Sequence, residues 1–194
     1  MTFTHRRVER FRSVIGRRQR DLTVVLENIH DPHNVSAILR SCDAVGILGV
    51  ELLYTVEKFP KLGKKSSSSA SKWIERRKHT DVGSCYATLR EEGFRILATK
   101  VAGEAPSLYD LDLTGPVAIV LGNEHRGVSD EAAVAADAMF RVPMNGMIES
   151  LNVSVAAAVC VFEAYRQRLS KATLAHSALR PEDQARILQD WLHR

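Results

Sequence analysis

The amino-acid sequence predicts an α/β protein with a parallel β-sheet that helices cover on both faces. Two observations support this class. Short runs of aliphatic and β-branched residues, such as 22–26 and 117–121, show no alternation of polar and apolar positions, which is typical of strands buried on both faces. Longer segments with apolar residues at helical spacing separate these runs. Strands that alternate with helices in this way form parallel sheets.

The first element expected is a basic amphipathic helix over residues 3–19, in which apolar residues recur at near-helical spacing among arginines. Residues 22–26 form the first strand. A helix follows, because Asp31 can cap its first turn, Pro32 suits the first helical position and Gly46 ends the pattern. Four polar residues share one side of this helix: His33, Ser36, Arg40 and Asp43.

The rest of the chain continues the same alternation. Further strands are expected at 50–54, 94–98, 117–121 and 139–142. Further helices are expected at 83–92, 130–137 and 151–169, and a last short helix begins near Pro181. With 194 residues the chain has the length of one domain. We assign that domain to residues 21–169, with helical extensions at 1–20 and 170–194.

Positive charge is concentrated in two places. The formal net charge is +4, but residues 1–20 hold seven arginines and one glutamate, which leaves the rest of the chain with a net charge of −2. A second basic segment, at 58–78, surrounds a serine-rich stretch at 66–71. Two basic patches suit a polyanionic partner such as RNA, because each phosphate contact releases counterions. The alternative is a solvated helix face beside a loose loop.

Composition argues against several other classes of protein. Cys42, Cys85 and Cys160 are odd in number and lack C-x-x-C spacing, so we expect buried thiols rather than disulfides or structural zinc. His30 and His33 have no further histidine or cysteine cluster beside them in the sequence, and no metal is expected. The sequence has neither the run of roughly 18 apolar residues that a membrane helix needs nor a signal peptide. We therefore expect a soluble protein of the cytoplasm.

Ligands of open parallel sheets bind beyond the carboxyl ends of the strands, and two of the loops there are elaborate. The loop 122–127 places polar residues between two glycines, and the loop 143–152 contains a proline and a glycine and leads into a helix. No G-x-G-x-x-G or G-x-x-x-x-G-K-[ST] follows any predicted strand. The alternative for either loop is an ordinary turn, and any cofactor must be held in another way.

Three long segments are similar, in order and spacing, to the three motifs of the SpoU (TrmH-type) RNA ribose methyltransferases: 22–46, 119–129 and 142–156. The arginine-rich N-terminal helix, the loop 71–73 and the tail 163–168 also resemble the tRNA branch of that family. The sequence departs from the family pattern in two places. Arg20 stands where relatives often have proline, and residues 66–69 are all serine where relatives mix glycine and alanine.

The resemblance implies the SPOUT fold over residues 21–169, a parallel sheet whose C-terminal portion is tied in a deep trefoil knot, in a homodimer. Nothing in the periodicity of the sequence indicates the knot. The resemblance also implies S-adenosylmethionine as methyl donor, with main-chain groups of the loops hydrogen-bonded to adenine and ribose and with glycines that allow close approach. By the same analogy six residues contact this cofactor: Thr99, Leu121, Gly122, Val142, Met144 and Leu151.

The reaction that the resemblance implies is transfer of a methyl group to a ribose 2′-hydroxyl, with the guanosine at position 18 in the D-loop of tRNA as leading substrate. The family pattern places Arg40 at this hydroxyl, where a side chain that stays charged stabilises the developing alkoxide. Four further residues orient Arg40, the ribose and the cofactor loop: Asn34, Glu124, Ser150 and Asn152. Helix capping is the alternative role for the last two. Methylation of ribosomal RNA and non-catalytic RNA binding are the alternative functions.

Basic side chains in the N-terminal arm, in the basic segment and near the end of the long helix are the expected RNA contacts. Such contacts bind RNA phosphates. The choice of substrate then depends on the shape of the RNA and on the one ribose that it presents to the site. The residues expected to make them are Arg6, Arg7, Arg10, Arg12, Arg17, Arg18, Lys64, Lys65, Arg166 and Arg168.

Overall fold

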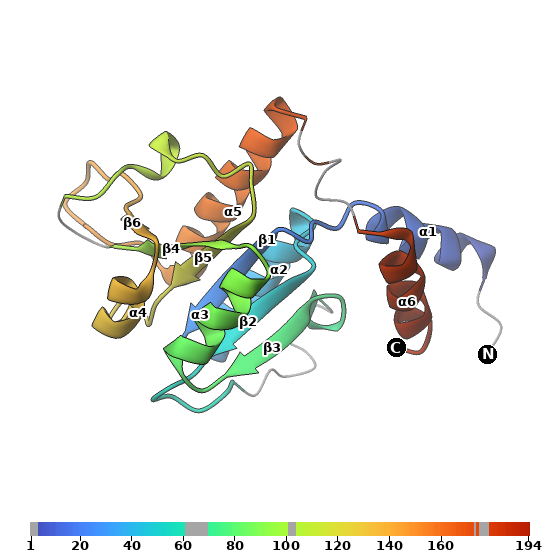
Figure 1. The fold of residues 1–194 in the computed structure, drawn as a ribbon, viewed down its shortest axis with the longest axis horizontal. Coiled ribbons are helices and arrows are strands. Elements are labelled where there is room, and N and C mark those ends of the chain that lie inside the picture. The colour runs from blue at the N-terminus through green and yellow to red at the C-terminus, as the bar shows by residue number, and fades with distance from the viewer. Residues whose placement is uncertain (1–3, 61–69, 101–103, 173, 175–178) are drawn as a thin grey trace.

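The computed structural model describes residues 4–60, 70–100, 104–172, 174 and 179–194, and it confirms the predicted parallel sheet. Six strands, each parallel to its neighbours, lie in the order β3-β2-β1-β5-β4-β6 (Figure 1). Their bounds are β1 Leu22–Glu27, β2 Gly49–Leu53, β3 Glu75–His79, β4 Arg95–Thr99, β5 Val117–Leu121 and β6 Ala138–Phe140. Every residue of the central strands β1 and β5 is buried.

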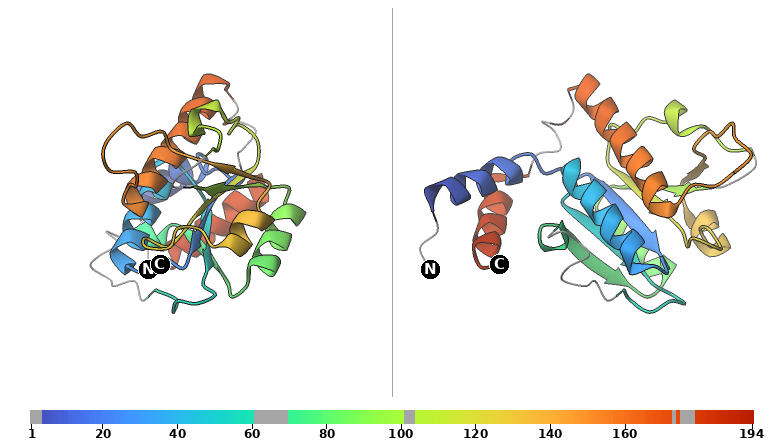
Figure 2. Two further views of the ribbon diagram at one scale, coloured as in Figure 1. Left: turned by 90° about the vertical axis from the view of Figure 1, so that its left-hand side faces the viewer. Right: turned by 180° about the vertical axis from the view of Figure 1, so that it is seen from behind.

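Helices cover both faces of the sheet, which is why the central strands read as continuous apolar runs. The helices are α1 His5–Ile15, α2 Pro32–Ala44, α3 Val82–Glu91, α4 Asp130–Ala135, α5 Val153–Ser170 and α6 Pro181–Leu192. Two short 3₁₀ turns are η1 Ala70–Lys72 and η2 Leu108–Asp110. Helices α2 and α5 pack together on one face, and α3 and α4 lie on the other (Figures 1 and 2).

The predicted elements are present, with ends that differ by a few residues. Helix α1 ends at Ile15, not at residue 19, because the main-chain N–H of Gln19 binds the carbonyl oxygen of Gly46 at 2.7 Å instead. Helix α5 begins at Val153, not at residue 151, because Asn152 is its N-cap. Helix α4 ends at Ala135, two residues early, and the last strand covers 138–140 where we expected 139–142.

Strand β3 was not predicted, since no strand or helix was expected within the basic segment at 58–78. This strand pairs with β2 alone and forms one edge of the sheet. Arg76 and Lys78 are exposed, whereas Arg77 is partly buried and its Nη2 lies 2.7 Å from a carboxylate oxygen of Glu51 on β2. An edge strand can carry charged residues, which protect it from pairing with other chains.

The two helical extensions form one structural unit, which we call the terminal lobe. Helix α1 packs against α6 at one end of the molecule (Figure 1). The rings of Phe11, Trp73 and Trp191 meet there, with centroids between 4.9 and 5.6 Å apart. The division into separate extensions at 1–20 and 170–194 therefore missed a shared apolar core, which also includes Ile15 and Ile187.

The three cysteines are free and buried, as predicted. Burial raises the pKa of the Cys160 thiol to about 12, so this side chain stays protonated at neutral pH and packs as a small apolar group. Among the described helices none is long and apolar enough to span a membrane. The trefoil knot stays a prediction.

Candidate functional site

A cavity of about 410 Å³ lies beyond the carboxyl ends of β4 and β5, where the elaborate loops meet. The loop after β5 and the loop before α5 supply most of its wall. All six residues expected at the cofactor line this cavity, although they come from four separate segments of the chain: Thr99, Leu121, Gly122, Val142, Met144 and Leu151. Glu124 and Ser150 line it too. The sequence-based prediction thus selected residues that the fold brings together.

Gly122 occupies a position that no other residue can take without a shift of the backbone. A Cβ atom there would lie 2.0 Å from the carbonyl carbon of Gly127 and 2.1 Å from the nitrogen of Val128. The chain closes on itself at this point, because the N–H of Gly127 donates to the carbonyl oxygen of Asn123 at 2.8 Å. Gly127 itself has a φ of 69°, which favours glycine. The loop 122–127 is therefore not an ordinary turn.

Asn28 joins three loops at the end of β1. Its backbone has a φ of 50°, which is uncommon for a residue with a side chain. Its side-chain oxygen accepts hydrogen bonds of 3.0 to 3.1 Å from the main-chain N–H groups of residues 55–57. The side-chain amide of Asn123 donates to the carbonyl oxygen of Asn28 at 2.7 Å. The loops after β1, β2 and β5 are thereby fixed to one another.

Three of the expected catalytic residues form one hydrogen-bonded chain beside the cavity. The carboxylate of Glu124 accepts hydrogen bonds from the side-chain amide of Asn34 at 2.8 Å and from the main-chain N–H groups of His30 and Asp31 at 2.9 and 3.2 Å. The side-chain amide of Asn152 donates to the side-chain oxygen of Asn34 at 3.1 Å. We call the chain of Glu124, Asn34 and Asn152 the amide network.

Asn152 makes hydrogen bonds through both ends of its side-chain amide. Its side-chain oxygen accepts a hydrogen bond of 2.9 Å from the N–H of Ser154, which caps α5. Its amide nitrogen at the same time binds Asn34 in the amide network. Ser150 is exposed, lines the cavity and lies before the N-cap. Capping therefore belongs to Asn152.

Glu124 is the electrostatic centre of the amide network. Burial raises the pKa of its carboxyl, but hydrogen bonds from the Asn34 side chain and from the His30 and Asp31 backbone outweigh burial and hold the pKa below its usual range. Glu124 is therefore ionised at neutral pH. A fixed negative charge at this point accepts three N–H groups and so sets the position of the first turn of α2.

Arg40 lies on the exposed side of α2. It comes six residues after Asn34, which is about 9 Å along a helix that rises 1.5 Å per residue. Arg40 is not among the described residues that line the cavity. Within this chain the structure therefore places Arg40 on the same helix as the amide network, at a distance from the expected cofactor residues.

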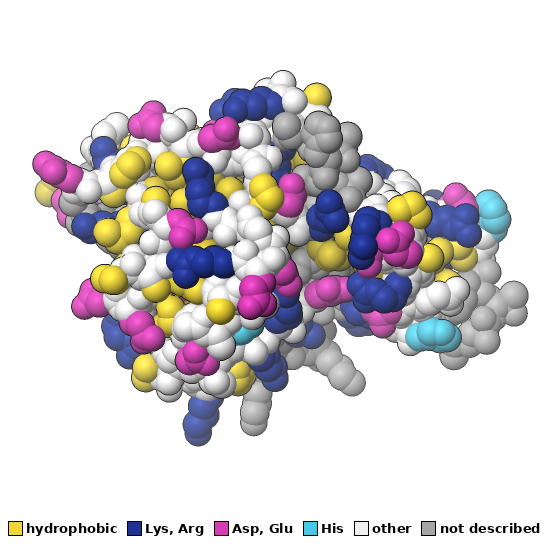
Figure 3. Space-filling model, in the orientation of Figure 1, with side chains coloured by type: hydrophobic (Ala, Val, Ile, Leu, Met, Phe, Trp, Pro, Cys, Tyr) yellow, Lys and Arg dark blue, Asp and Glu magenta, His cyan; other side chains and the backbone are white. Residues whose placement is uncertain are grey.

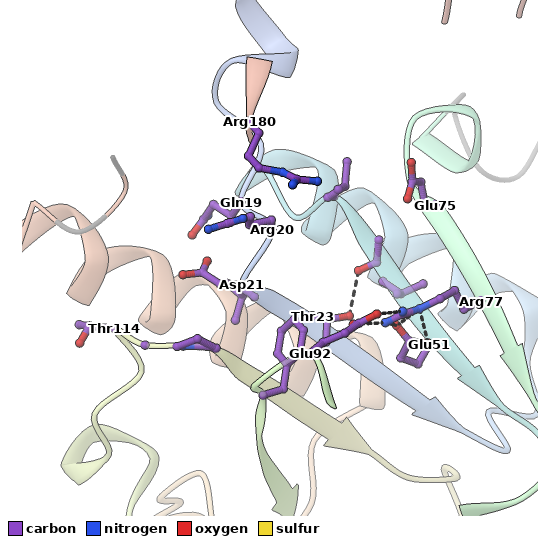
Figure 4. A pocket seen from close by; sticks show the side chains of 17 residues that line it. Gln19, Arg20, Asp21, Thr23, Glu51, Glu75, Arg77, Glu92, Thr114 and Arg180 are labelled. Carbon is purple, nitrogen blue, oxygen red and sulfur yellow. Dashed lines mark hydrogen bonds and ion pairs between the residues drawn. The ribbon is translucent and has the colours of Figure 1, made fainter. Parts of the chain in front are cut away.

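A larger cavity, of about 800 Å³, lies at the opposite ends of the strands (Figure 4). Three of its charged groups are paired with one another, since Arg77 points between Glu51 and Glu92 and binds both. The buried Glu51 also lies 2.7 Å from the ring of His79. Ligands of parallel sheets bind at the carboxyl ends of the strands, so the smaller cavity is the candidate site.

Of the basic residues expected to contact RNA, some are exposed, some are buried, and two lie outside the described residues. Five are exposed on or just after α1, where dark blue side chains lie over the terminal lobe in Figure 3: Arg6, Arg7, Arg10, Arg12 and Arg17. Arg166 is exposed as well, and it pairs with Glu163 at 2.8 Å. Lys64 and Lys65 lie outside the described residues.

Arg18 and Arg168 correct the prediction, because their side chains are 1% and 0% exposed. Arg18 binds Asp43 and donates to the carbonyl oxygen of Ile47 at 2.9 Å. Arg168 binds Asp21 at 2.6 Å, and its guanidinium also donates to main-chain oxygens, including that of Gly115. Both are buried charges with local partners, so neither is an RNA contact in this fold.

Sequence reasoning missed three residues at the rim of the cavity. Arg126 lines the cavity and binds Glu57 at 2.9 Å, and His30 lies on the other side of that carboxylate. Asn28, which orders these loops, was also missed. Their position in the sequence could have indicated them, because Asn28, Glu57 and Arg126 each lie in a loop after a strand that ends at this edge of the sheet.

Comparison with known proteins identifies the family of the chain. A family model described as the SpoU rRNA Methylase family matches residues 21–162. The chain belongs to the SpoU methylase family. A tRNA (guanosine(18)-2′-O)-methyltransferase of Thermus thermophilus is 44% identical over 191 residues, which are 98% of each chain. Membership of the SpoU family confirms the resemblance found from the three motifs.

Solved SpoU structures share the fold. The crystal structure of the A. aeolicus TrmH/SpoU tRNA modifying enzyme has a TM-score of 0.90 and 36% identity, and covers 97% of this chain and 95% of that chain. The SpoU methyltransferase AviRb from Streptomyces viridochromogenes, in complex with the cofactor AdoMet, has a TM-score of 0.70 and 26% identity and covers 81% and 62% of the two chains. The predicted SPOUT class of fold is thereby confirmed.

Proposed function

We propose that this protein transfers a methyl group from S-adenosylmethionine to the ribose 2′-hydroxyl of the guanosine at position 18 of tRNA. The observation that carries the proposal is the amide network of Glu124, Asn34 and Asn152 beside a cavity that requires glycine at 122. Relatives of similar length with the guanosine-18 activity, at up to 44% identity, support this choice of substrate. We expect the protein to act in the cytoplasm.

The cavity suits S-adenosylmethionine. Its volume of about 410 Å³ falls within the roughly 300 to 1,000 Å³ of small-molecule sites. Leu121, Val142, Met144 and Leu151 supply apolar wall for an adenine ring. Gly122 lets the backbone of residues 127 and 128 pack against it, which shapes the loop on this side of the cavity. When bound, this cofactor supplies a methyl group on a sulfonium that is already activated, so no metal is needed for the transfer.

Arg40 is proposed to act on the ribose hydroxyl by charge. Guanidinium stays protonated in proteins, so Arg40 stabilises the developing alkoxide electrostatically, and we assign the proton to a phosphate oxygen of the RNA. Glu124 and Asn34 hold the first turn of α2, which positions this helix. Ser150 and Asn152 belong to the loop that faces the cofactor. Stabilisation of the alkoxide raises the rate without any change in the affinity for the ground state.

We propose a homodimer that uses the outer face of α5. Val155, Phe162 and Leu169 are seven residues apart along this helix and 48%, 48% and 52% exposed. Such a row of large apolar side chains on one helix face suits burial against another helix. A second copy of this chain is the occupant that the family resemblance implies. The exposed arginines of α1 bind tRNA phosphates in this proposal.

Ribosomal RNA is the second candidate substrate, because the matching family model carries that name. The experiment offers labelled S-adenosylmethionine with separate tRNA and ribosomal RNA pools. We expect label in tRNA alone, and its loss from a transcript with 2′-deoxyguanosine at position 18. Label in ribosomal RNA alone would favour the second candidate. Absence of label from both pools, with intact cofactor binding, would favour a non-catalytic RNA-binding protein.

A further inference from the structure

A carboxylate holds two basic side chains at the rim of the candidate site. Arg126 Nη2 donates to Glu57 Oε1 at 2.9 Å, and His30 Nδ1 lies 3.5 Å from Glu57 Oε2. The three side chains come from the loops after β1, β2 and β5 and are 66%, 27% and 56% exposed for His30, Glu57 and Arg126. We call these three residues the rim cluster.

The position of Glu57 in the rim cluster is fixed by the backbone. Its main-chain N–H donates to the side-chain oxygen of Asn28 at 3.1 Å, next to the same contacts from Thr55 and Val56. Asn28 is in turn bound by Asn123 at 2.7 Å. Exposed ion pairs contribute little to stability. The backbone thus holds Glu57 at this place, and its ion pair with Arg126 adds little to folding.

The rim cluster is joined to the amide network through His30. The main-chain N–H of His30 donates to Glu124 at 2.9 Å, while its ring faces Glu57. Arg126 follows Glu124 by two residues and lines the cavity. A nucleotide whose ribose reaches the cavity would therefore bring its base close to Glu57 and Arg126.

We propose that Glu57 and Arg126 read the base of the methylated nucleotide as guanine, an inference that rests on the proposed function. Guanine offers N1–H and N2–H₂ donors on its Watson–Crick edge and O6 and N7 acceptors on its other edge. The carboxylate of Glu57 accepts hydrogen bonds from N1–H and N2–H₂. The guanidinium of Arg126 donates hydrogen bonds to O6 and N7. Adenine would place its N1 acceptor against the carboxylate and its amino group against the guanidinium.

The charges of the rim cluster suit this pairing. The hydrogen bond from Arg126 lowers the pKa of Glu57, so the carboxylate remains an acceptor at neutral pH. Guanidinium carries five N–H donors, and the bond to Glu57 uses one of them. The contact between His30 and Glu57 is long, at 3.5 Å. A base with two N–H donors can therefore replace His30 at that carboxylate.

The test compares wild-type protein with Glu57→Gln on three tRNA transcripts, with guanosine, inosine or adenosine at the target position. Glutamine keeps the size of the side chain and removes the charge. Glu91→Gln, at the exposed end of α3 on the far side of the sheet, is the matched control. The readouts are kcat/KM for each transcript and the affinity for S-adenosylmethionine measured by calorimetry.

For wild type and Glu91→Gln we expect guanosine to be preferred over inosine and inosine over adenosine. For Glu57→Gln we expect kcat/KM on guanosine to fall about tenfold or more and the guanosine-to-adenosine ratio to shrink by a similar factor, with unchanged cofactor affinity. If Glu57→Gln lowered kcat/KM equally on all three transcripts, or left the ratios between transcripts unaltered, the role of Glu57 in reading guanine would be wrong, while the proposed function would stand. Absence of methyl transfer by wild type to the guanosine transcript would overturn the proposed function itself.

Discussion

Asn152 and Asn34 are 118 positions apart in the sequence, yet their side-chain amides share a hydrogen bond of 3.1 Å. This contact joins the N-terminal ends of α5 and α2, which pack on the same face of the sheet. Through Asn34 it also reaches the carboxylate of Glu124. One pair of amides therefore sets the loop 143–152 relative to the helix that carries Arg40.

Asn152→Asp separates the two roles of Asn152. Aspartate is as good an N-cap as asparagine, so we expect a melting temperature close to that of wild type. It cannot donate to the side-chain oxygen of Asn34, and two oxygens would face each other. We expect kcat for methyl transfer to fall at least tenfold. Normal turnover by a folded Asn152→Asp protein would limit Asn152 to capping.

Arg40→Ala should abolish methyl transfer and weaken tRNA binding only modestly. One charge among many adds little to affinity, whereas it acts directly on the alkoxide. Arg40→Lys should also be poor, because a point charge does not reproduce the planar guanidinium. Single-turnover rates and filter binding would measure the two effects. Retention of more than about a tenth of wild-type turnover, a loss under roughly 1.4 kcal/mol, would contradict the assigned role.

Gly122→Ala should disrupt the loop 122–127, because its Cβ would lie 2.0 Å from a backbone carbon of Gly127. We expect at least a tenfold weaker affinity for S-adenosylmethionine by calorimetry. Gly115→Ala is the matched control, since a Cβ at Gly115 meets nothing within 4 Å. The control should differ from wild type by no more than about 0.5 kcal/mol in stability. Wild-type cofactor affinity in Gly122→Ala would place the cofactor elsewhere.

Arg168→Ala and Arg166→Ala should differ sharply in stability, although they are neighbours on α5. Arg168 is fully buried against Asp21, and removal of one partner of a buried ion pair costs about 3 to 5 kcal/mol. Arg166 is 67% exposed and pairs with Glu163 on the same helix, an interaction worth no more than about 1 kcal/mol. Urea unfolding would measure both, and equal losses would contradict this assignment.

Alanine at Arg6, Arg7, Arg10 and Arg12 together tests the arm as an RNA-binding element. All four side chains are exposed, so the melting temperature should change little. The dependence of log affinity for tRNA on log salt should flatten by about 0.7 to 0.9 for each phosphate that the variant no longer neutralises. Deletion of residues 1–20 is a poorer test, because it also removes Phe11 and Arg18 from their buried surroundings. An unaltered salt slope would mean that the arm does not contact RNA phosphates.

The central strands could be predicted because their signal is local, whereas the expected cofactor residues came from the family resemblance. Buried strands such as 117–121 are continuous apolar runs, and parallel strands present their carboxyl ends at one edge. Strand β3 could not be predicted in this way, because Glu75, Arg77 and the residues around them are charged, and only pairing with β2 makes them a strand.

Burial of a charged residue depends on partners far away in the sequence. Arg168 reads as part of a basic tail, and its partner Asp21 lies 147 positions away. The same holds for the left-handed backbone of Asn28, which depends on the loop at residues 55–57. Composition and spacing contain neither fact, so these residues were misassigned or missed.

The packing of α1 against α6 has a consequence for synthesis of the chain. The apolar side of α1 is synthesised before residues 21–169, and Leu179, Ile187 and Trp191 of the core that it shares with α6 are synthesised after them. The sheet can form during translation, whereas the terminal lobe must close afterwards. Until α6 has been synthesised, Phe11 and Ile15 therefore lack the apolar cover that Ile187 and Trp191 provide.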